Sequence, residues 1–258
     1  MIVGRLSRMN VAHIRSRITR IDAPTVALLL AVLAAMGWFV APFGVALVIG
    51  AQLIVGGMGG VWLVGPIRPR YGFARYGIPA LAAVAATLVG RLLTGPLQFV
   101  AMPVVAAALY GVIWAEVELP SGRVPRLAID IALVGIVFAV AAGVAVALPR
   151  LSWPPALLLV LMAAALPALR AAELRGRSGI SAVGDAALHL LALAQLGAAL
   201  ALLDLPGVVS PALLALGFHA WSGAAESLEA GAPRRAILAE FGTLAVLGIL
   251  VALLLHGR

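Results

Sequence analysis

The chain is a succession of apolar runs separated by short segments rich in glycine, proline and arginine. Nine of these runs reach or approach the ~20 apolar residues that a helix needs to cross a bilayer. They cover residues 24–41, 44–65, 78–94, 97–117, 127–148, 154–171, 182–203, 208–227 and 236–255. The pattern therefore predicts an all-α fold, a polytopic transmembrane helical bundle of about nine spans.

The composition favours lipid over water as the solvent. The chain is 64% hydrophobic and 11% charged, whereas a soluble domain carries about 25% charged residues. One soluble core cannot enclose that much apolar surface, so we expect the lipid bilayer to be the main partner. Residues 1–23 are predicted to form a basic cytoplasmic segment, and residues 24–258 a single transmembrane domain.

Arginine placement predicts the orientation. All 18 basic residues are arginines. If the nine runs alternate in direction, fifteen of them fall on the side of the N-terminus, and only Arg150 and Arg258 fall on the other. Because cytoplasmic loops collect arginine, we expect a multi-pass protein of the cell (cytoplasmic) membrane with the N-terminus in the cytoplasm and the C-terminus outside. The fifteen are Arg5, Arg8, Arg15, Arg17, Arg20, Arg68, Arg70, Arg75, Arg123, Arg126, Arg170, Arg175, Arg177, Arg234 and Arg235.

The segments between the runs are short. On the side opposite the arginines they read "APFG", "TGP", "PRLSWPP" and "LDLPGVVSP", in which proline and glycine end one helix and begin the next. This predicts four tight hairpins and a ninth, C-terminal helix. Almost the whole chain then lies in the bilayer, so any function must be performed there or at its faces.

Two features of the early spans concern helix packing. Gly56 and Gly60 form a small-xxx-small face, which predicts the close approach of another helix. Arg91 lies near the outer end of its predicted span. Its long side chain either snorkels to the interface or pairs within the bundle.

Several function classes lack support in the sequence. There is no cysteine, which excludes disulfides, thiolate metal sites and cysteine nucleophiles. The positive charge suits lipid headgroups, and no basic patch is interleaved with aromatic residues, so nucleic acid is not an expected partner. No phosphate-binding loop, nucleophile elbow or zincin motif occurs. We assign no catalytic residue and no cofactor, and a non-enzymatic role is preferred.

The candidate site lies in the hairpin of the seventh and eighth runs. Asp185 and His189 are four residues apart and share one helix face, and His219, Ser222 and Glu226 share a face of the next helix. Both histidines are expected about 10–12 Å from the inner ends of their helices. If the two faces meet, two imidazoles and two carboxylates converge as a ligand- or proton-binding site.

Three interpretations of this cluster stay open. The side chains can act as interhelical hydrogen-bonding groups without any ligand. They can relay protons or hold a cation. They can ligate a divalent metal or, through two level histidines, a haem. The spacing departs from the Glu-x-x-His pairs of di-iron bundles, and we assign no metal.

Three functional classes follow. The preferred one is a small transporter or permease-like bundle with a cytoplasm-facing polar cavity. The second is an accessory or structural subunit of a larger membrane complex, with membrane-protein partner subunits. The third is a membrane-embedded enzyme acting on a lipid or isoprenoid. A water-accessible cavity lined by the candidate residues favours transport or catalysis. Tight packing of these residues, or their exposure to lipid beside a partner, favours the subunit.

Overall fold

The structure is a computed structural model that describes residues 22–64, 72–147, 151–203, 205 and 207–255. Within these residues the fold is all-α, with nine α-helices, two short 3-10 segments and no strand. The predicted fold class is thereby confirmed. The expected basic N-terminal segment lies, apart from its last two residues, outside the described residues.

The helices follow the predicted runs closely, and every boundary lies within four residues of the expected one. In chain order they are α2 (Ala23–Phe39), α3 (Pro42–Val64), α4 (Ile78–Gly90), α5 (Pro96–Glu118), α6 (Arg126–Ala147), α7 (Trp153–Leu174), α8 (Gly179–Ala201), α9 (Val209–Glu229) and α10 (Arg234–Leu255). The 3-10 segments are η2 (Ala74–Tyr76), before α4, and η3 (Leu119–Ser121), after α5. Because proline stands at the first turn of α2, α4, α5 and α7, it starts these helices without losing an intrahelical hydrogen bond.

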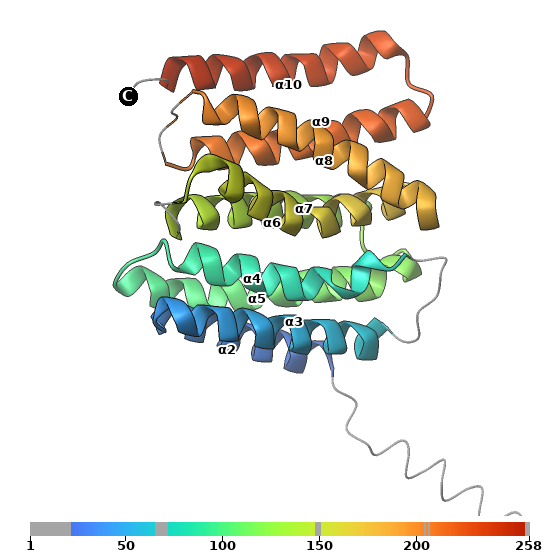
Figure 1. The fold of residues 1–258 in the computed structure, drawn as a ribbon. Helices are drawn as coiled ribbons and strands as arrows, with labels where there is room; N and C mark the ends of the chain where they lie inside the picture. The colour runs from blue at the N-terminus through green and yellow to red at the C-terminus, as the bar shows by residue number, and fades with distance from the viewer. Residues whose placement is uncertain (1–21, 65–71, 148–150, 204, 206, 256–258) are drawn as a thin grey trace, which may run out of the picture.

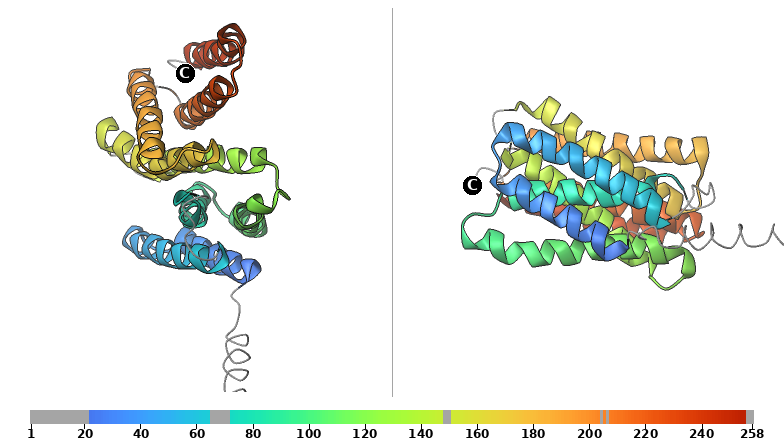
Figure 2. Two further views of the ribbon diagram at one scale, coloured as in Figure 1. Left: turned by 90° about the vertical axis from the view of Figure 1, so that its right-hand side faces the viewer. Right: turned by 90° about the horizontal axis from the view of Figure 1, so that it is seen from below.

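The helices lie roughly side by side and form a stack (Figure 1). Helices α2 and α3 occupy one edge, α4 to α7 the middle, and α10 the opposite edge (Figure 2). The connections α3–α4, α5–α6, α7–α8 and α9–α10 lie at one end of the stack (Figure 1). We call this the arginine-bearing end, because Arg75, Arg123, Arg126 and Arg175 lie in or beside these connections.

Six helices are long and apolar enough to cross a membrane, namely α3, α5, α6, α7, α8 and α10. Helix α2, with 17 residues, and α4, with 13, are shorter. Helix α9 falls outside the group because histidine, serine and glutamate lower its hydropathy. These apolar helices indicate a membrane-embedded protein.

Helix α4 is the central helix of the first half. It contacts α2, α3, α5 and α6, and most of its residues are buried. Its 13 residues extend only about 20 Å, less than the ~30 Å hydrocarbon core. The span expected at 78–94 is therefore shorter than predicted. The chain leaves the helix after Gly90, and Leu92 and Leu93 form turn hydrogen bonds to Val89 and Gly90.

The glycine face of α3 explains how α4 is packed. A Cβ at Gly56 would lie 2.5 Å from the Ala80 Cα atom, and a Cβ at Gly60 would collide with the Tyr76 carbonyl oxygen. Only glycine permits this approach of two backbones. Beside this contact, the buried Gln52 amide donates to the Thr87 hydroxyl oxygen at 2.7 Å. The close helix approach expected from the sequence is present.

Candidate functional site

Asp185 lies in a cluster of charged side chains at the arginine-bearing end. Its carboxylate forms an ion pair with the Arg175 guanidinium, which follows α7. Glu229, at the end of α9, lies 2.9 Å from Arg177 and 3.8 Å from Arg175. Asp185 therefore ties the start of α8 to Arg175, and the two arginines of the α7–α8 connection tie it to the end of α9.

His189 is sealed inside the bundle. It has no exposed surface, and its ring stacks on Phe218 with centroids 4.3 Å apart and planes inclined by 27°. The Trp221 ring lies on the same side of α9, at 6.0 Å. Among the described residues, neither ring nitrogen of His189 has a hydrogen-bond partner of normal geometry. The imidazole thus occupies an aromatic environment.

The polar face of α9 is directed toward α6. Glu226 Oε1 lies 3.0 Å from the Arg126 guanidinium at the start of α6. Asp130, one turn further along α6, interacts electrostatically with both Glu226 and His219. The His219 side chain itself is exposed, and Ser222 Oγ is buried without a hydrogen-bond partner among the described residues.

The two expected faces do not meet as one polar surface. Both histidines are ten residues from the arginine-bearing ends of their helices, about 15 Å. Successive helical residues are rotated by about 100°, so Phe218 faces His189 whereas His219 points elsewhere. The structure brings Asp185 to Arg175 after α7, His189 to an aromatic pair and Glu226 to α6, and it leaves the His219 side chain exposed. In the described part of the chain, no three His, Asp or Glu residues are grouped as metal ligands.

A second charged cluster was not expected from the sequence. We call it the buried ion network, and it consists of Arg75, Glu116, Arg170 and Glu173. Arg170 donates to both carboxylate oxygens of Glu116, at 3.0 and 2.6 Å, and lies 3.4 Å from Glu173. Arg75 donates to the Glu116 carbonyl oxygen at 2.8 Å. Both Arg170 and Glu116 are almost completely buried.

The buried ion network joins three elements, α5, α7 and η2. Glu173 accepts hydrogen bonds from the backbone amides of Phe73 and Ala74, at 2.5 and 3.0 Å, where η2 begins. A bidentate arginine–carboxylate pair fixes orientation as well as distance. The signal in the sequence is Arg170 and Glu173, three residues apart near the end of α7. The charge pattern of the sequence assigned Arg170 to a loop, so its ion pairs within the bundle were not expected.

Arg91 pairs within the bundle at the opposite end. Its guanidinium donates to the carbonyl oxygens of Gly37 and Val40, at 2.8 and 3.0 Å, where α2 ends. The last carbonyls of a helix lack intrahelical partners and carry the negative end of its dipole. Arg91 therefore caps a neighbouring helix.

Two well-formed cavities between helices are mainly apolar. One, of about 330 Å³, lies between α8, α9 and α10. Another, of about 410 Å³, lies between α3, α4 and α6, with Arg91 as its charged lining residue. The five predicted site residues line neither of them.

Comparison of the chain with protein-family models, with curated proteins and with solved structures finds no match. The functional argument therefore rests on the geometry of the helices and their polar side chains.

Proposed function

We propose that this protein is an accessory or structural subunit of a larger membrane complex, a non-catalytic bundle that is completed by a partner helix. The observation that carries the proposal is His219, a polar side chain that is exposed at the middle of α9. A polar group at this depth is costly against hydrocarbon, and it acts as a hydrogen-bonding group between helices when a partner covers it.

A second exposed polar residue supports the same proposal. Gln195 lies in the outer half of α8, six residues from the end of the helix, and its side chain is exposed. Helices α8 and α9 thus each carry an outward polar group within the span. A neighbouring transmembrane helix with hydroxyl, amide or carboxyl side chains would satisfy a group of this kind.

The charges of the expected transport site also favour a subunit. Asp185 pairs with Arg175, and Glu226 pairs with Arg126. Ion pairs within the chain leave these carboxylates poorly suited to receive a cation, because binding it requires breaking the pair first. The structural interpretation of the candidate cluster is therefore preferred to a ligand- or proton-binding one.

A transporter is the second candidate, and one observation favours it. His189 and Ser222 keep buried polar atoms without hydrogen-bond partners among the described residues. Burying such atoms costs free energy unless a water molecule or an ion satisfies their hydrogen-bonding capacity. A conformation that admits water between α8 and α9 would turn them into a polar pathway.

For orientation, we propose nine crossings with the arginine-bearing end in the cytoplasm. The alternating helices of Figure 1 support this, together with the positive-inside bias. A reporter fused after residue 258 should be active on the outer side of the cell membrane, and one fused before residue 1 in the cytoplasm. A cytoplasmic C-terminal reporter would contradict the odd number of crossings.

The subunit proposal is tested by copurification from native membranes in a mild detergent. The wild-type chain should carry a second membrane protein in fixed stoichiometry. His219→Leu should lose that partner and keep the thermal stability of the chain, because the side chain is exposed. Leu250→Ala, at an exposed position of α10, serves as the matched control and should keep the partner.

The outcome that contradicts the proposal is equally definite. If the wild-type chain purifies alone and mediates solute or proton flux in liposomes, the transporter is correct. In that case His189→Leu should abolish the flux, and His219→Leu should have the smaller effect.

A further inference from the structure

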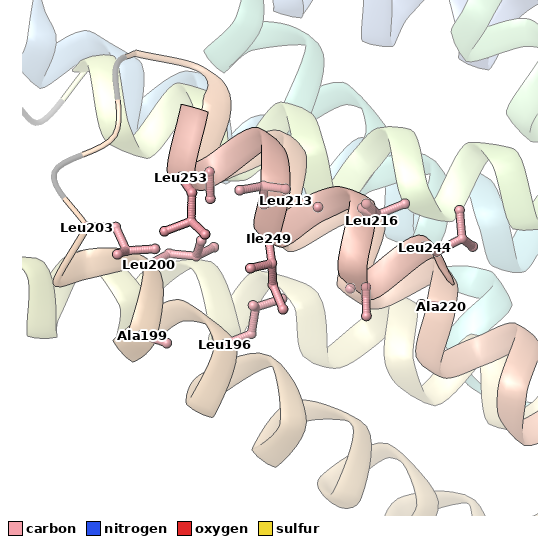
Figure 3. A pocket seen from close by; sticks show the side chains of 14 residues that line it. Leu196, Ala199, Leu200, Leu203, Leu213, Leu216, Ala220, Leu244, Ile249 and Leu253 are labelled. Carbon is pink, nitrogen blue, oxygen red and sulfur yellow. The ribbon is translucent and has the colours of Figure 1, made fainter. Parts of the chain in front are cut away.

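An apolar groove runs along α9 between α8 and α10. Its floor is formed by Gly217, Ala220 and the leucines beside them, and its walls by α8 and α10 (Figure 3). Helices α8 and α10 each pack on α9 but not closely on each other, and this leaves a space between α8 and α10. The groove lies in the half of the bundle away from the arginines, because its far end is lined by Leu203 and Leu253.

The groove continues deeper than this one cavity. A second space, of about 280 Å³, shares Leu196, Gly217 and Ala220 with the first and ends at Trp221 and Ala224. From Leu213 to Ala224 the two spaces follow twelve residues of α9, about 16 Å. The two spaces adjoin each other between the outer end of the bundle and its middle.

The chemistry of the lining selects hydrocarbon. The labelled side chains of Figure 3 are leucines, alanines and an isoleucine, and the other lining residues of this space are glycine and alanine. A water molecule needs two to four polar partners to occupy a cavity, and none projects into this one. An empty groove would forfeit the dispersion contacts of its walls. The bilayer supplies apolar chains at high concentration.

Size decides between an acyl chain and a protein helix. A methylene group needs roughly the 30 Å³ that a water molecule takes in the liquid, so the space of about 330 Å³ has room for about ten such groups in a row. A helix about 10 Å in diameter could only lie across the open side of the groove and would leave this space unfilled. The groove is therefore wide enough for one extended chain and too narrow for a helix.

We propose that the groove between α8, α9 and α10 binds one acyl chain of a phospholipid from the leaflet opposite the arginine-bearing end. The chain fills the gap that leucine and alanine leave between three helices, and the headgroup lies beyond the ends of α8 and α10. The bound lipid thereby acts as a packing element that holds α10 to the bundle. This site does not depend on whether the protein has a partner subunit.

The first test is native mass spectrometry of the protein extracted in a mild detergent. The wild-type chain should retain one phospholipid, and Ala245→Phe, which fills the groove from α10, should lose it. The matched control is Val246→Phe, because Val246 is exposed on the same helix and does not line the groove. It should retain the lipid. Equal retention by both variants overturns the proposal.

A second measurement uses the wild-type chain alone and does not depend on the folding of a variant. The protein is reconstituted with a phospholipid that carries a photoreactive group on its acyl chain, and the labelled residues are mapped. Labels should concentrate on Leu196, Leu216 and Ile249. Labels spread evenly over the exposed faces of α2, α3 and α5, or crosslinks at the groove to a second copy or another protein, contradict an acyl chain as the occupant.

Discussion

The helices at the two opposite edges of the stack, α2 to α4 and α8 to α10, are packed by different means. At the α2–α4 edge, glycines allow backbones to touch, and side-chain hydrogen bonds join the helices. At the α8–α10 edge, glycines face side chains instead of backbone: a Cβ at Gly217 would meet the Leu196 side chain, and a Cβ at Gly223 would meet the Phe241 ring. The comparison shows that helices at one edge pack backbone against backbone, whereas helices at the other pack through side chains and leave an apolar groove between them.

The largest expected effect concerns the buried ion network. Glu116→Gln removes one of the two carboxylates of the network and should lower the free energy of unfolding by about 3–5 kcal/mol, because two buried arginines, Arg75 and Arg170, then share the single carboxylate of Glu173. Glu229→Gln, in the ion pairs of the α8–α10 edge, should cost less than about 1 kcal/mol, because Arg177 and Glu229 are solvent-exposed. Unfolding by SDS titration measures both. Equal losses would refute the contrast.

Next in size is the glycine contact between α3 and α4. Gly60→Ala places a methyl group against the Tyr76 carbonyl oxygen and should destabilise the chain by about 1–3 kcal/mol. Gly242→Ala adds the same methyl group in open space and should stabilise α10 by up to about 1 kcal/mol. Thermal unfolding in detergent compares the two. A neutral Gly60→Ala would show that α3 and η2, which leads into α4, are further apart than described.

A smaller effect separates two threonines. Thr87→Val removes the hydroxyl that accepts from Gln52 and should cost about 1 kcal/mol, because this hydrogen bond is buried between helices. Thr243→Val on α10 removes only a bond to the Ala239 carbonyl of its own helix, at an exposed position, and should be nearly neutral. Both are measured by the same thermal assay. An equal loss in the two variants would contradict the different packing of the two edges.

The smallest expected change in stability concerns Asp22, the N-cap residue of α2. Asp22 accepts hydrogen bonds from the side-chain hydroxyl and backbone amide of Thr25, which lower the pKa of its carboxyl below the usual value. A lowered pKa means that the stabilisation is complete above the unfolded-state pKa and is lost as the pH falls through the folded-state pKa.

The comparison of wild type with Asp22→Asn tests this cap. The difference in thermal stability should be constant above about pH 5 and shrink toward about pH 3, because asparagine caps without titrating. A difference that does not change over this range would remove the role of the charge.

The helices were largely predictable, whereas the arrangement of polar groups was not. Apolar run length and proline position fix where α5 and α6 begin and end, and both are local properties of the sequence. The face that α9 turns toward α8 depends on the relative rotation of two helices. A rotation of about 100° places Phe218, and not His219, against His189. Asp185, His189, His219, Ser222 and Glu226 were thus correctly placed along the chain but assigned to one common surface.

The buried ion network shows the same limit. Glu116 and Arg170 are 54 residues apart, and their contact depends on how α5 and α7 meet at η2. Arg170 counts as a loop residue in a charge pattern, yet it lies inside α7, which continues to Leu174, and Glu116 neutralises it within the bundle. The small-xxx-small face of α3 was predictable, because glycine spacing constrains the helix itself.

The central claim is that the outward face around His219 is covered by another protein in the native membrane. A photocrosslinking amino acid at position 219 tests it most directly, with position 250 on α10 as the lipid-facing control. The account predicts one discrete crosslinked protein from position 219 and lipid adducts from position 250. Lipid adducts alone from both positions would contradict it.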